Sequence, residues 1–242
     1  MAAERARRDG QPGYLLHTYP YRETSLVAEV YTRDSGRVAL IARGARRPRS
    51  ALRGVLMAFQ PLLFAWSGKA ELKTLHKAEW QGGYLPLRGL SLICGFYLNE
   101  LLLKLLPRED PHENLFEAYA AALAQLPSAH DHAAVLRRFE RVLLQELGYG
   151  LVFDREVTTG AAIAAEGRYR YVPDRGPVAA AETDGQSGVE LAGKTLLDMA
   201  VDQYTDPRTV QQSKALMRAL INHCLGNQTL HTRQLLRDLQ QL

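Results

Sequence analysis

The sequence predicts an α+β, multidomain protein in which a small all-β domain precedes a mainly α-helical one. Residues 13–80 hold short apolar runs separated by turn-forming Gly, Pro, Asp and Ser residues, as is typical of strands. After residue 82, apolar residues recur at helical spacing in longer segments. Charge divides the chain in the same way. Residues 1–80 carry 14 Lys or Arg against 7 Asp or Glu, whereas residues 81–242 carry 16 against 19, which favours a polyanion-binding face on the first domain.

Five strands are expected in the first domain. They cover residues 14–18, 26–31, 38–42, 62–66 and 72–78. Residues 1–12 precede them and are expected to form a flexible basic tail. Five short strands in so little sequence suit a closed barrel better than a sandwich, and the five-stranded barrel that binds oligonucleotides is the OB-fold. We therefore expect an OB-fold DNA-binding domain over residues 13–80.

Helices are expected to dominate the second domain, residues 81–242. They cover residues 90–106, 111–126, 131–147, 196–201, 207–226 and 231–242. Asp110-Pro111 and Asp206-Pro207 each combine an N-cap with a proline suited to the first helical turn, and Asp131 is a third candidate cap. Gly148 is well placed to end the helix before it. The segment 149–191 is rich in Gly, Ala, Thr and Asp, and we expect an irregular insertion there.

Composition argues against several classes of protein. Cys94 and Cys224 are the two cysteines, and neither lies in a Cys-x-x-Cys pair, which argues against a zinc ribbon and a disulfide framework. The most apolar segment, residues 90–106, is interrupted by polar residues such as Asn99 and Glu100, so no membrane span is expected. The first dozen residues lack the apolar region of a signal peptide. We expect a soluble, cytoplasmic protein with no metal, no cofactor and no membrane partner.

The strongest candidate binding site is the arginine loop, residues 43–49, which follows the third expected strand. Its arginines surround Gly44 and Pro48, which break regular structure. Guanidinium groups offer a planar donor fork that matches phosphate, so the loop suits a polyanion; a solvated basic loop is the alternative. The candidate DNA-binding residues in and around it are Arg22, Arg37, Arg43, Arg46, Arg47, Arg49 and Arg53.

Aromatic residues among the strands add to this candidate site. Single-strand binders combine a basic groove with aromatic platforms on which bases stack. Tyr19 and Tyr21 flank Pro20 in an expected loop and are candidates for stacking. Tyr14 and Tyr31 are expected instead to fill the barrel.

A second candidate site lies on the helix over residues 131–147. Its residues are Leu136, Arg137, Arg138, Phe139 and Arg141. Arg137 and Arg141 are four residues apart and share one helix face. A cationic rim beside an apolar groove would hold a short acidic and hydrophobic peptide. The alternative is that Arg137 or Arg141 pairs with Glu140 or Glu146 along the helix.

Catalytic and metal-binding patterns are scarce. Residues 188–195 formally match the phosphate-loop pattern G-x-x-x-x-G-K-[ST], but residues 181–187 are too polar for the buried strand that must precede such a loop. Gly193-Lys194-Thr195 is expected to open a helix instead. Asp131, between His130 and His132, is expected to be a helix cap rather than a metal ligand. We expect no enzyme activity, and a phosphate-loop nucleotide-binding protein is the alternative function.

A series of short stretches resembles the RecO family of bacterial recombination mediators. The matching stretches are residues 22–26, 35–38, 42–47, 59–62, 71–75, 97–101, 136–140, 147–150 and 168–171, which include Ala42-Arg43-Gly44-Ala45-Arg46-Arg47 and Leu147-Gly148-Tyr149-Gly150. They keep the same order from about residue 14 to residue 236. No single stretch is diagnostic, but the ordered set is specific.

The resemblance implies a DNA repair function in the RecF pathway and nucleoid association. Proteins of this family bind single- and double-stranded DNA and anneal complementary strands. With RecR they help to load RecA on strands coated by single-stranded DNA-binding protein, whose acidic C-terminal tail they recognise. Some relatives carry a four-cysteine zinc site after the Gly-Tyr-Gly stretch, but this chain has no cysteine between residues 148 and 194, so no zinc site is expected.

Overall fold

The computed structural model describes residues 7–180 and 187–239, with side chains as far as residue 235. The chain divides into two compact units, each described here by itself. The first contains the chain as far as residue 128 and the C-terminal segment from residue 230. The second contains residues 129–229. The expected division into an OB-fold domain over residues 13–80 and a helical domain over residues 81–242 stays a prediction.

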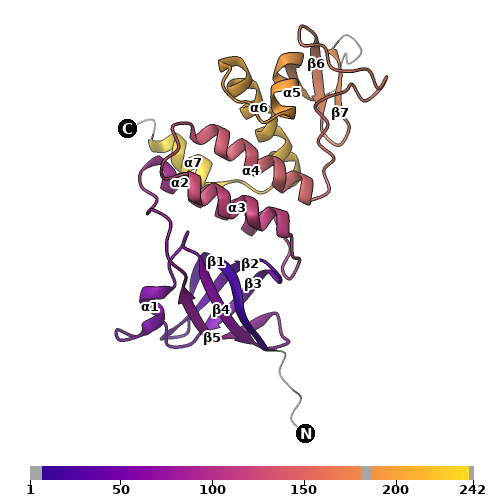
Figure 1. Cartoon of the computed structure of the whole chain (residues 1–242). Coiled ribbons are helices and arrows are strands. Elements are labelled where there is room, and N and C mark those ends of the chain that lie inside the picture. Colours follow the sequence, from indigo (N-terminus) through magenta and orange to yellow (C-terminus); the bar gives the residue numbers. More distant parts are fainter. Residues whose placement is uncertain (1–6, 181–186, 240–242) are drawn as a thin grey trace. The chain divides into compact units, whose positions relative to one another are not determined.

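A closed five-stranded barrel begins the first unit (Figure 1). Its strands are β1 (Arg7–Tyr21), β2 (Ser25–Thr32), β3 (Gly36–Ala42), β4 (Leu62–Ser67) and β5 (Leu72–Trp80). They follow the order β1-β2-β3-β5-β4, and β1 closes the barrel by pairing with β4. Only the β3–β5 pair is parallel among these strands. A short helix, α1 (Ala51–Val55), connects β3 to β4. This OB-fold arrangement confirms the predicted fold class.

The first strand is longer than expected. β1 begins at Arg7, so residues 7–12 belong to the barrel and not to a flexible tail; residues 1–6 lie outside the described part of the chain. The N-terminal half of β1 pairs with β4, and residues from Gly13 onward pair with β2. A strand with two successive partners must be long, and its polar first half is ordered by these long-range pairings.

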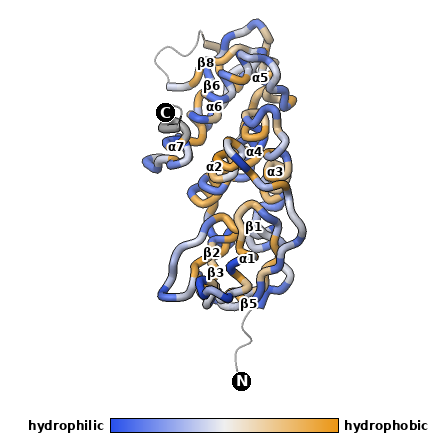
Figure 2. The backbone as a smooth tube through the Cα atoms, turned by 90° about the vertical axis from the view of Figure 1, so that its left-hand side faces the viewer, coloured by the Kyte–Doolittle hydropathy of each residue, from blue (hydrophilic) through white to orange (hydrophobic). Residues whose placement is uncertain are grey.

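Alternate residues of the strands fill the barrel. The core includes Leu15, Ala28, Val30, Val38, Leu40, Leu62, Phe64, Trp66 and Leu75. Three residues at α1, Leu52, Val55 and Leu56, pack against this core from the connection between β3 and β4. Figure 2 shows hydrophobic residues along the barrel strands and blue, hydrophilic segments gathered beside β3 and β5.

Three helices complete the first unit. They are α2 (Leu90–Leu105), α3 (Glu113–Gln125) and α7 (His231–Leu239). The predicted start of α3 is wrong, because its N-cap is His112 and not Asp110. The Glu109 N–H donates to the carbonyl of Arg37 at 2.9 Å, which ties this non-helical segment to β3. Glu109 has a φ of +60°, so the chain turns just before Asp110 and the helix starts after it.

Tyr14 and Tyr31 are buried, but they do not fill the barrel as expected. They are cross-strand neighbours on β1 and β2, and both rings contact Phe116 and Tyr119 of α3 at centroid distances of 5.1–6.1 Å. Side chains alternate between the two faces of a strand, and Leu15 takes the inward position next to Tyr14. The tyrosines therefore cover the outer wall of the barrel.

A carboxylate on α2 caps the C-terminal helix. Glu100 accepts hydrogen bonds from the N–H groups of His231 and Thr232, at 2.8 and 2.9 Å, and from the Thr232 hydroxyl. Lys104 pairs with the same carboxylate at 3.0 Å. Burial by itself would raise the pKa of Glu100, but these bonds outweigh it and lower the pKa to about 2.

Glu100→Ala is expected to reduce the free energy of unfolding by about 1–2 kcal/mol at pH 6, because α7 loses its N-terminal acceptor. The folded pKa lies below the ordinary value of 4.5, so this stabilisation is present above pH 4.5 and is lost as pH falls toward 2. Urea unfolding of both proteins at pH 6 and pH 3 measures the difference. The exposed Glu23→Ala serves as the control, and a gap between wild type and Glu100→Ala that stays constant with pH would refute this assignment.

The second unit combines three helices with a small sheet. The helices are α4 (His132–Glu146), α5 (Gly193–Ala200) and α6 (Pro207–Leu225). Asp131 caps α4 and Asp206 caps α6, each through two backbone N–H groups, as predicted. The expected irregular insertion is wrong in part, because it contains an antiparallel sheet of β6 (Arg168–Val172), β7 (Gly176–Ala179) and β8 (Val189–Ala192). Strands of four or five residues carry too little periodicity to be found by pattern.

Candidate nucleic-acid interface

The arginine loop is an ordered turn structure at the end of β3. Gly44 has a φ of +68°, a conformation that side chains other than glycine rarely adopt. Ala45 follows it and is buried in the barrel core, which anchors the middle of the loop. Backbone hydrogen bonds from Arg47 to Gly44 and from Ser50 to Arg47, both 3.0 Å, form consecutive turns that lead into α1. The loop therefore projects its arginines from a fixed backbone.

The β1–β2 turn lies beside this loop. The Arg46 N–H donates to the Thr24 carbonyl at 2.9 Å, and the Arg46 guanidinium reaches the Arg22 carbonyl at 3.4 Å. Arg22 in turn lies over the Tyr21 ring, 5.2 Å from its centroid. The structure thus brings Tyr21, Arg22 and the arginine loop together at one end of the barrel.

Six exposed arginines make up this surface, which we call the arginine surface. They are Arg22, Arg43, Arg46, Arg47, Arg49 and Arg53. Within the described ranges, no carboxylate pairs with any of them. Their charges face solvent without local neutralisation. An exposed surface of unpaired guanidinium groups can neutralise the phosphates of a polyanion.

Tyr19 lies on the outer wall of the same hairpin. Its side chain is 48% exposed, and its ring meets the His17 ring edge-on at 4.5 Å. Tyr19 and Tyr21 are two residues apart on β1 and therefore share a face. Tyr21 is half-buried. Tyr21 contacts Arg22 of the arginine surface, whereas Tyr19 interacts electrostatically with Arg37; a stacking role for the two tyrosines stays a prediction.

Arg37 has a different environment from the other predicted arginines. Its guanidinium donates to the Leu106 carbonyl at 2.9 and 3.2 Å and pairs with the buried Glu29 at 3.3 Å. Desolvation lowers the pKa of Arg37, although Glu29 opposes this effect. Arg108 contacts the same carboxylate. Arg37 therefore connects the barrel to the segment that follows α2, and it does not belong to the arginine surface.

The arginines of α4 do not form an exposed rim. Arg137 is 8% exposed and pairs with the fully buried Glu140 at 2.7 Å, which is the alternative stated above. Arg141 donates to the Met199 carbonyl at 2.9 Å and to Asp202 at 2.8 Å. Phe139 is buried, Leu136 is half-buried, and Arg138 is exposed with one long contact to the Asp202 carbonyl. Arg137 is thus engaged within α4, and Arg141 connects α4 to α5 and the residue Asp202 after it.

The residues that match the phosphate-loop pattern form a strand and the start of a helix. The pattern's four intervening residues form strand β8, not a glycine-rich turn. The N–H groups of Gly193 and Lys194 donate to carbonyls of Gly167 and Ala165, at 2.8 and 2.9 Å. The Lys194 ammonium pairs with Asp198. The groups that would hold a phosphate are therefore engaged within the protein, which contradicts the alternative of a phosphate-loop site.

The described residues hold neither a candidate metal cluster nor a helix suited to crossing a membrane. No cluster of three or more His, Cys, Asp or Glu side chains that would suit a metal ion occurs in residues 7–180 and 187–235. Among the helices described, none has the length and apolar character needed to cross a membrane.

Comparisons with known proteins agree with the sequence resemblance. The family model described as Recombination protein O N terminal matches residues 9–84, and Recombination protein O C terminal matches residues 88–233. The DNA repair protein RecO of Nitrosospira multiformis is 55% identical over 242 residues, which cover 100% of both chains. The DNA repair protein RecO of Aromatoleum aromaticum is 55% identical over 241 residues, 99% of this chain and 100% of that protein. With an OB-fold-like barrel and these matches along nearly its whole length, the chain belongs to the RecO family.

Proposed function

We propose that this protein binds DNA through the arginine surface and acts as a recombination mediator. Membership of the RecO family supports a role in DNA repair and recombination. The observation that carries DNA binding is the set of exposed, unpaired arginines held by an ordered loop on a closed barrel. OB-fold barrels bind oligonucleotides through one face and its flanking loops.

The proposed ligands are single- and double-stranded DNA. Phosphate neutralisation by arginine acts on both, because it needs no base contact. An exposed cationic surface would also hold one strand while its bases stay available, as strand annealing requires. RecR, RecA and single-stranded DNA-binding protein are proposed partners on the basis of the family, and the cytoplasm with its nucleoid is the proposed location.

Recognition of the acidic C-terminal tail of single-stranded DNA-binding protein is proposed for the second unit. The side chain of Arg137 is committed to Glu140, and Arg141 is committed to Asp202. Arg138 is the exposed arginine of the predicted set and is the proposed contact for a carboxylate. Charge-assisted bonds of this kind contribute about 1.5–3 kcal/mol.

Titration of DNA against salt concentration tests the proposed function. If four to five arginines each neutralise one phosphate, the slope of log affinity against log salt for a single strand is expected to be about −3, at −0.7 per contact. Fluorescence anisotropy of a labelled oligonucleotide between 50 and 200 mM salt, concentrations at which such slopes are measured, gives this slope. Absence of DNA binding at low salt, or an affinity that does not change with salt concentration, would rule out the arginine surface as a phosphate site.

A further inference from the structure

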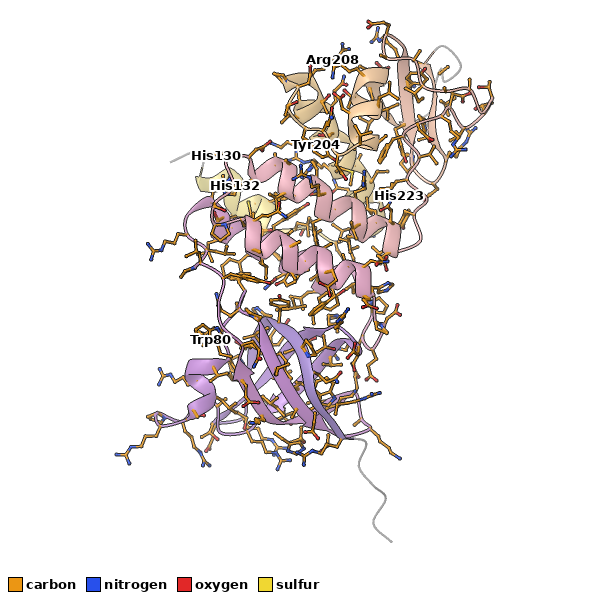
Figure 3. All side chains as sticks on the ribbon, in the orientation of Figure 1. Trp80, His130, His132, Tyr204, Arg208 and His223 are labelled. Carbon is orange, nitrogen blue, oxygen red and sulfur yellow. The ribbon has the colours of Figure 1, made fainter. Side chains whose placement is uncertain are left out.

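An exposed tryptophan lies at the same end of the barrel as the arginine loop. β1 and β3 both run antiparallel to β2, and β5 runs parallel to β3. The C-terminal ends of β1, β3 and β5 therefore lie at one end of the barrel. Tyr21, the arginine loop and Trp80 occupy these three ends. Figure 3 shows Trp80 at the side of the barrel where α1 lies, and α1 packs beside β5.

The two tryptophans of the chain have opposite environments. Trp66 is 1% exposed in the barrel core, whereas Trp80 is 53% exposed. Tryptophan side chains are highly buried on average, and leaving an indole in water forgoes the large stabilisation of its burial. An exposed indole at the end of the barrel that carries the arginine loop is therefore a candidate ligand contact.

The Trp80 ring is held in one orientation. Its Nε1–H donates to the side-chain oxygen of Gln60 at 3.3 Å, and the Gln60 amide donates to the Tyr84 carbonyl at 3.4 Å. The backbone at Gly83 passes close to the ring. A Cβ at that position would lie 3.0 Å from Cζ2 of Trp80 and 2.5 Å from the Gln60 oxygen. A side chain there would require Gln60 and the ring to shift, so glycine permits this close approach, and about half of the Trp80 side chain stays open to solvent.

We propose that Trp80 is a stacking platform for unpaired nucleobases of a DNA strand whose phosphates contact the arginine surface. This inference rests on the proposed function and adds a base-contacting residue to it. A single-strand site combines a cationic track with aromatic rings, and every base has a π-face that stacks on such a ring. Bases within a duplex are already stacked and paired. Trp80 therefore confers a preference for single-stranded DNA without sequence selectivity.

The exposed Leu85 allows a nucleobase-binding role of Trp80 to be distinguished from a role in protein docking. Leu85 is 69% exposed and follows Trp80 by five residues. A protein partner that covered this region would bury both side chains, because apolar area drives such contacts. A nucleobase stacks on the indole and gains little from an aliphatic side chain. Leu85→Ala is therefore the matched control for Trp80→Ala.

Equilibrium binding of a mixed-sequence oligonucleotide of about 16 nucleotides, the upper site size of an OB-fold, tests the proposal. Trp80→Ala is expected to weaken single-strand binding about tenfold, equal to about 1.4 kcal/mol, and to change duplex binding less than about twofold. The salt slope is expected to stay at the wild-type value, because an indole releases no counterion. Leu85→Ala is expected to bind both forms like wild type.

Intrinsic fluorescence gives a second readout that does not depend on the alanine variant. The wild-type protein is expected to lose indole emission when the single strand binds. Trp80→Phe retains an aromatic ring at the site and leaves Trp66 as the remaining tryptophan. This variant is expected to bind the strand within about threefold of wild type, because most of the stacking energy remains, but without an emission change.

The outcomes distinguish the two levels of the proposal. If wild type binds neither DNA form, the proposed function itself fails. If wild type binds both forms but Trp80→Ala binds the single strand equally well, or the emission of wild type is unaffected by it, DNA binding stands and the stacking role is overturned. Equal losses in Trp80→Ala and Leu85→Ala would point to a general apolar contact and would also overturn it.

Discussion

Simultaneous reversal of Arg43, Arg46, Arg47 and Arg49 to Glu is expected to abolish DNA binding at moderate salt. These side chains are exposed and carry no carboxylate partner within the described residues, so their charges are available to phosphate. Four lost contacts remove about 2.8 from the salt slope for a single strand, which corresponds to a loss of roughly 10²–10³-fold at 0.1 M salt relative to 1 M. Repulsion between the new carboxylates and the phosphates increases this loss.

A variant with the same change in net charge serves as the control. Reversal of Lys69, Arg88, Lys214 and Arg218, which are exposed outside the arginine loop, changes the formal charge equally, from +4 to −4. Anisotropy titration is expected to show a much smaller loss for this protein. Circular dichroism and thermal melts verify that both variants fold. Wild-type affinity in a folded loop variant would place the DNA site elsewhere on the molecule.

Arg137→Ala is expected to destabilise the second unit by about 3–5 kcal/mol, the largest stability effect among our predictions. The substitution leaves the Glu140 carboxylate fully buried without the guanidinium 2.7 Å away. Removal of one partner from a buried ion pair is costly, because the remaining charge stays out of water and loses the opposite charge that was paired with it. Urea unfolding followed by circular dichroism measures the loss.

Two further variants make this test specific. Arg138→Ala alters an exposed neighbour on the same helix and is expected to change stability by less than about 0.5 kcal/mol. Arg137→Met combined with Glu140→Leu removes both charges and is expected to recover most of the lost stability. Wild-type stability of Arg137→Ala would show that the pair contributes nothing.

An acidic tail peptide is expected to bind more weakly to Arg138→Ala than to wild type.

Local sequence patterns were sufficient for most of the architecture. Short apolar runs between turn-forming residues located all five strands of the barrel, because buried strands are brief and end at turns. Asp131 and Asp206 marked the starts of two helices, because a short carboxylate accepts the free N–H groups of the first turn. The arginine loop could be recognised from composition alone, since Gly44 and Pro48 interrupt the strand.

Contacts distant in sequence decided the rest. β1 extends back to Arg7 because β4 pairs with its polar half, and no local signal records that partner. Tyr14 and Tyr31 cover the barrel from outside because Phe116 of α3, which is 102 and 85 residues further on, supplies a ring against both of them. Arg37 looks like any exposed cation in the sequence, and only the fold shows that Glu29 holds it. For Arg137 the sequence left a peptide-binding role and pairing with Glu140 both open, and the fold shows the pair.

Trp80 is a further residue whose environment was decided by tertiary structure and not by local sequence. As the last residue of an expected strand region it resembles a core side chain, and the Gly82-Gly83 pair after it resembles an ordinary turn. The tertiary structure instead leaves the indole exposed and places it at the arginine end of the barrel. The sequence by itself thus determined the fold class and the cationic loop, because these depend on local periodicity and composition, and it indicated the family through an ordered set of matching stretches. Which of the arginines and aromatic rings are free to contact a ligand was decided by tertiary packing, because exposure depends on neighbours that are distant along the chain.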